Sequence, residues 1–120
     1  MSKVRIAKEF DFDAAHRLDR LPPEHKCHHL HGHTYRVVLT LEGVPGDIGF
    51  VVDYADIEKA WQPLHDILDH KYLNAIPGLE VPTTQVLVLW LWERLKAGEL
   101  GELLAGVRVY ESSTTYCEHP

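Results

Sequence analysis

The chain has 120 residues, 45% of them hydrophobic, which suffices to bury one core, so a single domain over residues 1–120 is expected. The longest apolar run, residues 86–92, is far too short for a membrane span, and the chain does not open with a secretory signal pattern, so we expect a cytoplasmic protein. A net charge of −6 argues against a general nucleic-acid binder, which needs a basic face. Residues 1–36 nevertheless hold seven basic against five acidic residues, so an anionic substrate would bind there, with Arg17 and Lys26 as candidate contacts.

Two segments in the first third alternate between apolar and polar residues, which is the period of a half-buried strand. The first covers residues 4–12 and the second covers residues 35–41. Extending each pattern at its own period adds three histidines to the apolar faces: His16, His31 and His33. If the two strands pair, we expect these three imidazoles to meet at one end of the inner face of the sheet.

Two helices are predicted in the middle of the chain. Asp53 can cap the first helix, whose apolar residues recur at helical spacing: Ile57, Ala60, Trp61, Leu64 and Leu68. Thr83 or Thr84 can cap a second helix that runs to about Ala97. Its apolar stretch, residues 86–92, could be a buried strand on periodicity alone, but the cap before it and the charged residues after it favour a helix. Because this helix is apolar all round, we expect it to be covered on both sides, with another subunit as one possible cover.

The chain closes with two more alternating segments, residues 107–111 and 114–117. Strands gathered at both ends of a helix pair predict an α+β fold, in which an antiparallel four-stranded sheet carries two helices on one face. Glu111 is in register with the apolar residues before it, so its carboxylate should point inward, where it needs hydrogen-bond donors. A ligand with a guanidine-like edge would supply them; the alternatives are a salt bridge to an arginine or an exposed strand end.

Histidines are concentrated in one window of 18 residues, which holds His16, His25, His28, His29, His31 and His33 together with Cys27. The three that fall on inner faces, His16, His31 and His33, would leave a tetrahedral zinc ion one open position, as catalytic sites do. Imidazole also suits iron, nickel and copper, so zinc is inferred from ligand type and availability. The alternative is a solvated loop next to ordinary core histidines. The other three histidines are expected on the surface of that loop.

Cys27 and an Asp-His pair are the remaining candidates for catalysis. Cys27 precedes His31 by four residues, and a nearby metal ion or protonated histidine would favour its thiolate. It could be a fourth ligand or a general base beside the metal, and spacing alone does not separate the two. Cys117 lacks such neighbours and is expected to be a structural or free thiol. Asp69 and His70 follow the first predicted helix, and an aspartate that orients a histidine is a common proton-transfer unit.

Five segments together match a known family in order and spacing: residues 12–16 (FDAAH), 27–33 (CHHLHGH), 68–74 (LDHKYLN), 82–85 (PTTQ) and 109–111 (VYE). They resemble the 6-pyruvoyl-tetrahydropterin synthase family over nearly the whole chain. The Cys-x3-His-Gly-His spacing is similar to that of its bacterial branch, the 6-carboxytetrahydropterin synthases of queuosine biosynthesis. The resemblance implies a tunnelling fold, in which antiparallel sheets join around a channel, and a homohexamer with active sites between subunits.

The implied reaction is the zinc-dependent conversion of 7,8-dihydroneopterin triphosphate to 6-carboxytetrahydropterin, acetaldehyde and triphosphate. The resemblance makes Cys27 the thiolate base, Asp69 and His70 the pair that delivers and removes protons, and Glu111 the anchor of the pterin. Relatives usually carry glutamate in place of Gln85, so any pterin contact there would lose a charge. The rival hypotheses are the pyruvoyl-forming triphosphate lyase and a non-enzymatic, histidine-rich metal-binding protein.

Overall fold

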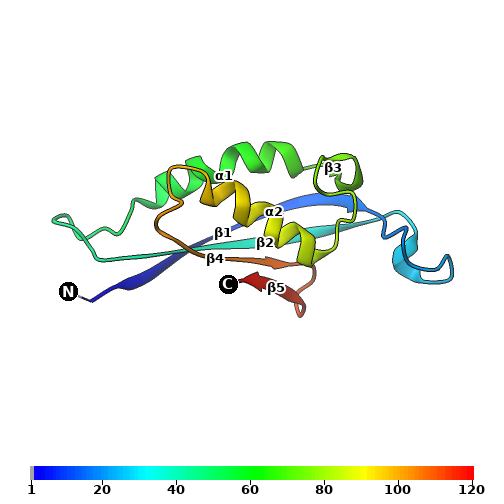
Figure 1. Cartoon of the computed structure of the whole chain (residues 1–120), viewed down its shortest axis with the longest axis horizontal. Helices are drawn as coiled ribbons and strands as arrows, with labels where there is room; N and C mark the ends of the chain where they lie inside the picture. The colour runs from blue at the N-terminus through cyan, green and yellow to red at the C-terminus, as the bar shows by residue number, and fades with distance from the viewer. Residues whose placement is uncertain (1) are drawn as a thin grey trace.

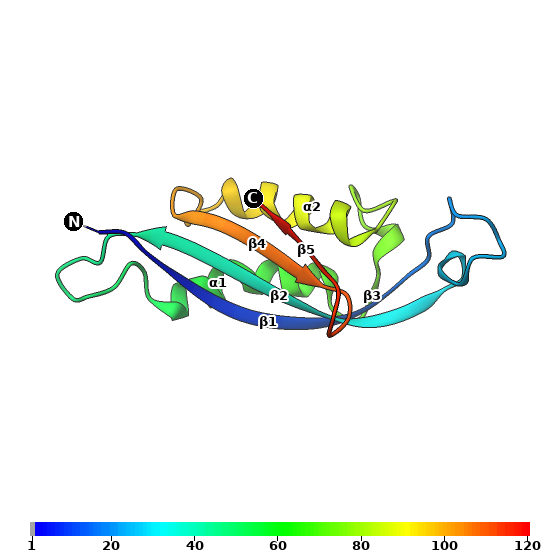
Figure 2. The same ribbon diagram turned by 90° about the horizontal axis from the view of Figure 1, so that it is seen from below.

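The computed structural model describes residues 2–120, which form one five-stranded sheet and two helices (Figure 1). The strands are β1 (Val4–His16), β2 (His31–Gly43), β3 (Lys71–Tyr72), β4 (Leu104–Tyr110) and β5 (Tyr116–His119). The helices are α1 (Tyr54–Leu68) and α2 (Thr84–Lys96), and short 3-10 turns lie at Lys26–His28 and Leu73–Ala75. The strands lie in the order β3-β1-β2-β4-β5, and both helices cover the same face of the sheet (Figures 1 and 2). The predicted α+β class and the two helices on one face are confirmed.

A long antiparallel hairpin, formed by β1 and β2, is the frame of the molecule. Its register places His16 opposite His31, and Ala14 opposite His33. Alternate residues along both strands are buried, and these face the helices, as the period of the sequence predicts. The end of this inner face therefore carries imidazoles where the rest of it carries apolar side chains.

The two helices begin where their caps predict. The Asp53 carboxylate accepts the Ala55 backbone N–H at 2.8 Å, and the Thr83 hydroxyl accepts that of Val86 at 3.2 Å. Both helices contribute to a core with the inner face of the sheet, and its side chains include Phe12, Tyr35, Val37, Leu39, Ile57, Trp61, Leu64, Leu87, Leu91, Val107 and Val109. The chain itself covers most of α2, but Leu89 on its outer side stays 48% exposed.

The sheet differs from the sequence-based expectation in two places. It has five strands because the two-residue β3 pairs in parallel with β1, and so short a segment has no detectable periodicity. The last strand starts at Tyr116, and β4 already ends at Tyr110. The reason is a turn between them, in which the Ser112 hydroxyl accepts the Thr115 backbone N–H at 3.1 Å and the Glu111 N–H donates to the Thr115 carbonyl at 3.2 Å.

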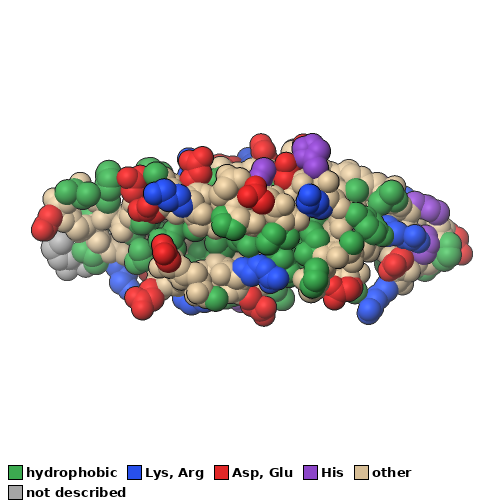
Figure 3. Space-filling model, turned by 90° about the horizontal axis from the view of Figure 1, so that it is seen from above, with side chains coloured by type: hydrophobic (Ala, Val, Ile, Leu, Met, Phe, Trp, Pro, Cys, Tyr) green, Lys and Arg blue, Asp and Glu red, His purple; other side chains and the backbone are tan. Residues whose placement is uncertain are grey.

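The molecule is elongated, with principal extents of 57 × 24 × 21 Å. Its radius of gyration is 15.7 Å, whereas a compact chain of this length would have about 14 Å. The face of the sheet opposite the helices is uncovered (Figure 2). Seen from the side of the helices, histidine side chains lie at the end formed by the loop between β1 and β2 and also on one long edge of the molecule (Figure 3). With 15 and 13 residues, α1 and α2 are both too short to cross a bilayer, which takes about 20 residues.

Candidate metal centre and active site

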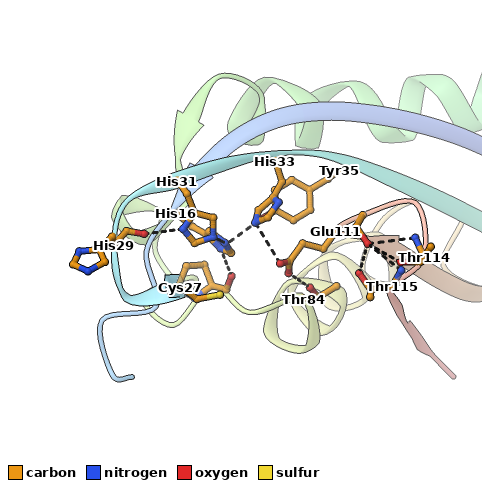
Figure 4. Close-up of polar contacts among 12 residues, drawn as sticks. His16, Cys27, His29, His31, His33, Tyr35, Thr84, Glu111, Thr114 and Thr115 are labelled. Atoms are coloured by element: carbon orange, nitrogen blue, oxygen red, sulfur yellow. Dashed lines mark hydrogen bonds and ion pairs between the residues drawn. The ribbon is translucent and has the colours of Figure 1, made fainter. Parts of the chain in front are cut away.

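Three histidines converge at the end of the β1–β2 hairpin, and we refer to His16, His31 and His33 as the histidine cluster (Figure 4). The atoms that they could offer to a metal all lie within 4.8 Å of one another. The His16 side chain is fully buried, and the other two are half-buried. Adjacent strands bring these rings together because all three lie on the face that the alternation predicts. Their role as metal ligands stays a prediction.

The outer nitrogens of two of these rings are tied to backbone carbonyl groups. His16 Nδ1 donates to the Pro82 carbonyl at 2.8 Å, and His31 Nδ1 donates to the His29 carbonyl at 2.7 Å. When these rings are neutral, each therefore has its lone pair on Nε2. The two Nε2 atoms face each other at 3.0 Å, where two lone pairs repel unless a cation or a proton lies between them. This donor arrangement fits a metal ion, since outer carbonyl partners commonly orient metal-binding histidines.

His33 completes the set and has an unpaired ring nitrogen. Its Nε2 atom is buried without a well-formed hydrogen bond, although Glu111 Oε1 lies 3.3 Å away. Burial lowers the pKa of His16 and of His33, so both rings are neutral at neutral pH. A metal requires that form of imidazole. The histidine cluster can therefore hold a metal ion in its folded geometry.

Glu111 stands between the histidine cluster and the first turn of α2. Its Oε2 accepts the Thr84 hydroxyl at 2.6 Å, its side chain is 28% exposed, and among residues 2–120 it forms no salt bridge to an arginine. Neither alternative considered from the sequence, an arginine partner or an exposed strand end, describes it. Thr84 was predicted only as a possible helix cap, so its contact with Glu111 is a site feature that sequence reasoning missed.

The short turn Lys26–His28, which we call the thiol turn, carries Cys27 beyond the end of the hairpin. The Cys27 side chain is half-buried and unpaired, and it is not a member of the group of potential ligands. Both backbone polar groups of Cys27 are bound: its N–H donates to His25 Nδ1 at 3.0 Å, and its carbonyl accepts the Leu18 N–H at 2.9 Å. His28 and His29 each donate to a backbone carbonyl of the same loop, so the three remaining histidines stabilise the loop.

Asp69 and His70 lie at the outer edge of β1, immediately after α1. Asp69 Oδ1 accepts the Asp13 backbone N–H at 3.0 Å, and the His70 N–H donates to the Asp13 carbonyl at 2.6 Å. His70 Nδ1 donates to Asp69 Oδ2 at 2.9 Å, so the predicted pairing of the two side chains is present. The Asp13 N–H and His70 lower the pKa of Asp69, and Asp69 raises the pKa of His70. His70 also adopts a φ of 59°, a left-handed conformation that costs a non-glycine residue roughly 1–2 kcal/mol.

This pair lies at the edge of β1, where it binds the backbone of Asp13. The His70 side chain is 76% exposed and lines an open cavity of about 530 Å³. Asp13, Ala15 and Thr34 line this cavity from the outer face of β1 and β2, and Ala14 and His33, which occupy inner-face positions, line it as well. Among residues 2–120, no hydrogen bond or ion pair joins Asp69 or His70 to Cys27 or to the histidine cluster. One chain therefore does not bring all the predicted site residues together.

The chain is similar to known proteins over most of its length. The family described as 6-pyruvoyl tetrahydropterin synthase matches residues 5–120. The chain is 38% identical to the 6-carboxy-5,6,7,8-tetrahydropterin synthase of Synechocystis sp., over 92% of this chain and 88% of the relative. It is 33% identical to the dihydroneopterin monophosphate aldolase of Pyrococcus furiosus, over 84% and 82% of the two chains.

Among solved structures, the 6-pyruvoyl tetrahydropterin synthase of Caenorhabditis elegans matches with a TM-score of 0.91 and 25% sequence identity, covering 99% of this chain and 96% of that one. This likeness confirms the tunnelling fold that the resemblance implies. The match also runs through both helices and all the strands that carry the candidate site. On its sequence and its fold, the chain belongs to the 6-pyruvoyl tetrahydropterin synthase family.

Proposed function

We propose that this chain is a zinc-dependent 6-carboxytetrahydropterin synthase of queuosine biosynthesis, which converts 7,8-dihydroneopterin triphosphate and water to 6-carboxytetrahydropterin, acetaldehyde and triphosphate. The observation that carries the proposal is a set of three converging imidazoles, two of them with fixed tautomers, next to a carboxylate that forms no ion pair with a lysine or an arginine among residues 2–120. The identity of 38% to a relative named for this product supports the choice within the family. Both cysteines are unpaired, which suits the reducing cytoplasm where we place the enzyme.

The histidine cluster would hold the zinc ion. Three imidazoles leave a tetrahedral ion one open position, and the bound ion would make the side-chain hydroxyls of the pterin and the adjacent carbon more acidic. Burial lowers the pKa of His16 and of His33, which favours the neutral imidazole that a metal needs and so supports this assignment.

Two residues of the same chain would act directly on the substrate. Cys27 lies outside the ligand group, which supports its role as the thiolate that takes a proton from the substrate side chain. Glu111 would hold the amino-pyrimidine edge of the pterin by charge-assisted hydrogen bonds. The Thr84 hydroxyl donates to Oε2 of that carboxylate, and Oε1 lies 3.3 Å from His33 Nε2.

Asp69 and His70 would act on the substrate bound to another copy of the chain. Their exposed position at the edge of the sheet, without a hydrogen bond or ion pair to Cys27 or the histidine cluster among residues 2–120, supports an active site between subunits, and the homohexamer follows from the resemblance. The elongated shape, the uncovered sheet face and the exposed Leu89 also suit a chain that buries more surface on assembly. In this arrangement the pair delivers and removes protons that Cys27 does not reach.

The test is product analysis with zinc-loaded and metal-stripped protein. Incubated with 7,8-dihydroneopterin triphosphate, the zinc-loaded protein should release acetaldehyde and 6-carboxytetrahydropterin, and the stripped protein should release neither. A 6-pyruvoyl product without acetaldehyde would replace this proposal with the pyruvoyl-forming reaction. Turnover of dihydroneopterin monophosphate instead would place the chain with its Pyrococcus relative.

The same preparation separates an enzyme from a metal-binding protein. A metal-binding protein predicts several ions per chain, dependence on the loop histidines His25, His28 and His29, and indifference to Cys27→Ala. The proposed enzyme predicts one ion per chain, and Cys27→Ala should keep the ion but lose turnover.

A further inference from the structure

The one asparagine of the chain, Asn74, binds the backbone at the point where β1 leaves the sheet. Its Oδ1 accepts the Arg17 N–H at 3.0 Å, and its Nδ2 donates to the Arg17 carbonyl at 2.8 Å. Because each amide atom meets its opposite, the orientation of the side chain is determined. Strand β3 pairs with Ala14 and Ala15, and the Asn74 side chain continues this parallel pairing to Arg17, as a peptide group would.

Arg17 connects two parts of the candidate site. It follows His16 directly, and the next residue, Leu18, donates its N–H to the Cys27 carbonyl at 2.9 Å. The Arg17 guanidinium lies 3.4 Å from His28 Nε2, which can accept from it because His28 Nδ1 donates to a carbonyl. The thiol turn is therefore attached at two points to the segment that Asn74 holds.

We infer that Asn74 is a positioning residue that keeps the Cys27 thiol at a constant distance from the metal ligand His16. The inference rests on the proposed function for its catalytic meaning, but its geometry does not depend on which pterin is the substrate. Without Asn74, the Arg17 N–H and carbonyl lose their partners, and the chain between His16 and the thiol turn is free to shift. Small displacements of this kind strongly affect reactions that need aligned groups.

The experiment measures how strongly zinc affects the thiol. Cys27 and Cys117 are alkylated with iodoacetamide at pH 7, with and without zinc, and the rate at each cysteine is read by mass spectrometry. In the wild-type protein we expect zinc to change the Cys27 rate several-fold and to leave the Cys117 rate unchanged. We call the ratio of the alkylation rates with and without zinc the zinc effect. In Asn74→Ala, the zinc effect on Cys27 should approach one, while the zinc content stays the same.

Two further variants complete the test: a second substitution at Asn74 and a matched control at Gln62. Asn74→Asp retains an acceptor for the Arg17 N–H but sets a carboxylate oxygen against the Arg17 carbonyl, so it should lose the zinc effect even if the alanine variant does not fold. Gln62→Ala removes a matched amide, which donates to Asp66 at 2.9 Å on the exposed side of α1, and should behave as wild type. Turnover should fall roughly 10–100-fold in both Asn74 variants with KM little changed.

An unchanged zinc effect in a folded Asn74 variant would overturn the inference, and so would a wild-type protein whose Cys27 does not respond to zinc. Neither the alkylation rate nor the zinc content depends on turnover of a substrate. If the wild-type protein forms no 6-carboxytetrahydropterin but Asn74→Ala still abolishes the zinc effect, the proposed function fails and the positioning role stands.

Discussion

The histidine cluster and the Asp69–His70 pair are both built from histidines, yet their surroundings differ in every physical respect. His16 is fully buried, its outer nitrogen is tied to a carbonyl, and burial lowers its pKa. His70 is largely exposed, its ring donates to a carboxylate, and that carboxylate raises its pKa. The first environment favours a neutral ring that can bind a metal, and the second favours a charged ring that can carry a proton.

Under the proposed function, the two regions would have different roles. The histidine cluster would hold an ion next to Glu111, and the pair at the edge of the sheet would present a proton donor to solvent or to a partner. Because no hydrogen bond or ion pair joins the two regions among residues 2–120, each should have its own effect when it is disrupted.

The largest effect is expected from removing a ligand. His31→Ala should reduce zinc content from about one ion per chain to near zero and abolish turnover, because two imidazoles do not form a stable site. The loss of zinc affinity should exceed the roughly 10–100-fold loss that follows when a hydrogen-bond partner of a metal ligand is removed. Metal analysis after dialysis against a mild chelator measures the zinc content of each variant. His29→Ala is the control, since its exposed side chain only donates to a loop carbonyl; a parallel loss of zinc there would contradict the assignment.

Removal of the thiol should affect turnover alone. Cys27→Ala is expected to keep its zinc and its melting temperature and to lower kcat about 10²–10⁴-fold, the range for a missing general base. Cys117→Ala, which removes the other thiol, should retain activity. Loss of zinc in Cys27→Ala would show that the thiol is a fourth ligand.

A smaller effect, with a distinct pH signature, is expected from the edge pair. The lowered pKa of Asp69 and the raised pKa of His70 mean that their ion pair is complete between the ordinary values of 3.8 and 6.5, and is lost only as pH rises through the raised value or falls through the lowered one. In Asp69→Asn the pKa of His70 should fall back toward its ordinary range, and kcat should drop roughly 10²-fold, the lower end of the range for acid–base catalysis.

NMR titration of the His70 ring measures the first change, and the alkaline limb of the pH–rate profile should move to lower pH with it. Asp66→Asn, in the last turn of α1 and bound to Gln62, is the matched control. If the alkaline limb stays in place while the His70 pKa falls, then His70 is not the acid that the rate depends on.

The histidine cluster could be located from the sequence because the side-chain period of a strand is fixed by its geometry. Once β1 and β2 pair, His16, His31 and His33 share a face whatever the detail of the loop between them. Glu111 was predicted to face inward for the same reason, and it does so although β4 ends one residue earlier. Local periodicity was sufficient for these residues.

Other features of the site depend on contacts between distant segments, which no local pattern encodes. The place of Asp69 and His70 follows from the backbone of Asp13, 56 residues before Asp69. The Thr84 hydroxyl donates to the Glu111 carboxylate, 27 residues further along the chain. From the sequence, Thr84 could only be recognised as a possible helix cap. The conformation of the thiol turn likewise depends on Leu18 and on ring contacts within an irregular loop.

In the proposed enzyme, Cys27 and the histidine cluster of one chain work with Asp69 and His70 of another, and subunit mixing tests this arrangement most directly. Cys27→Ala and His70→Ala are each expected to be inactive alone. If the two are refolded together, about a quarter of the sites in random mixed oligomers would combine a native Cys27 with a native His70, and activity should return to that level. Mixed oligomers, verified by native mass spectrometry, that remain as inactive as the separate variants would contradict the account, because both groups would then act within a single chain.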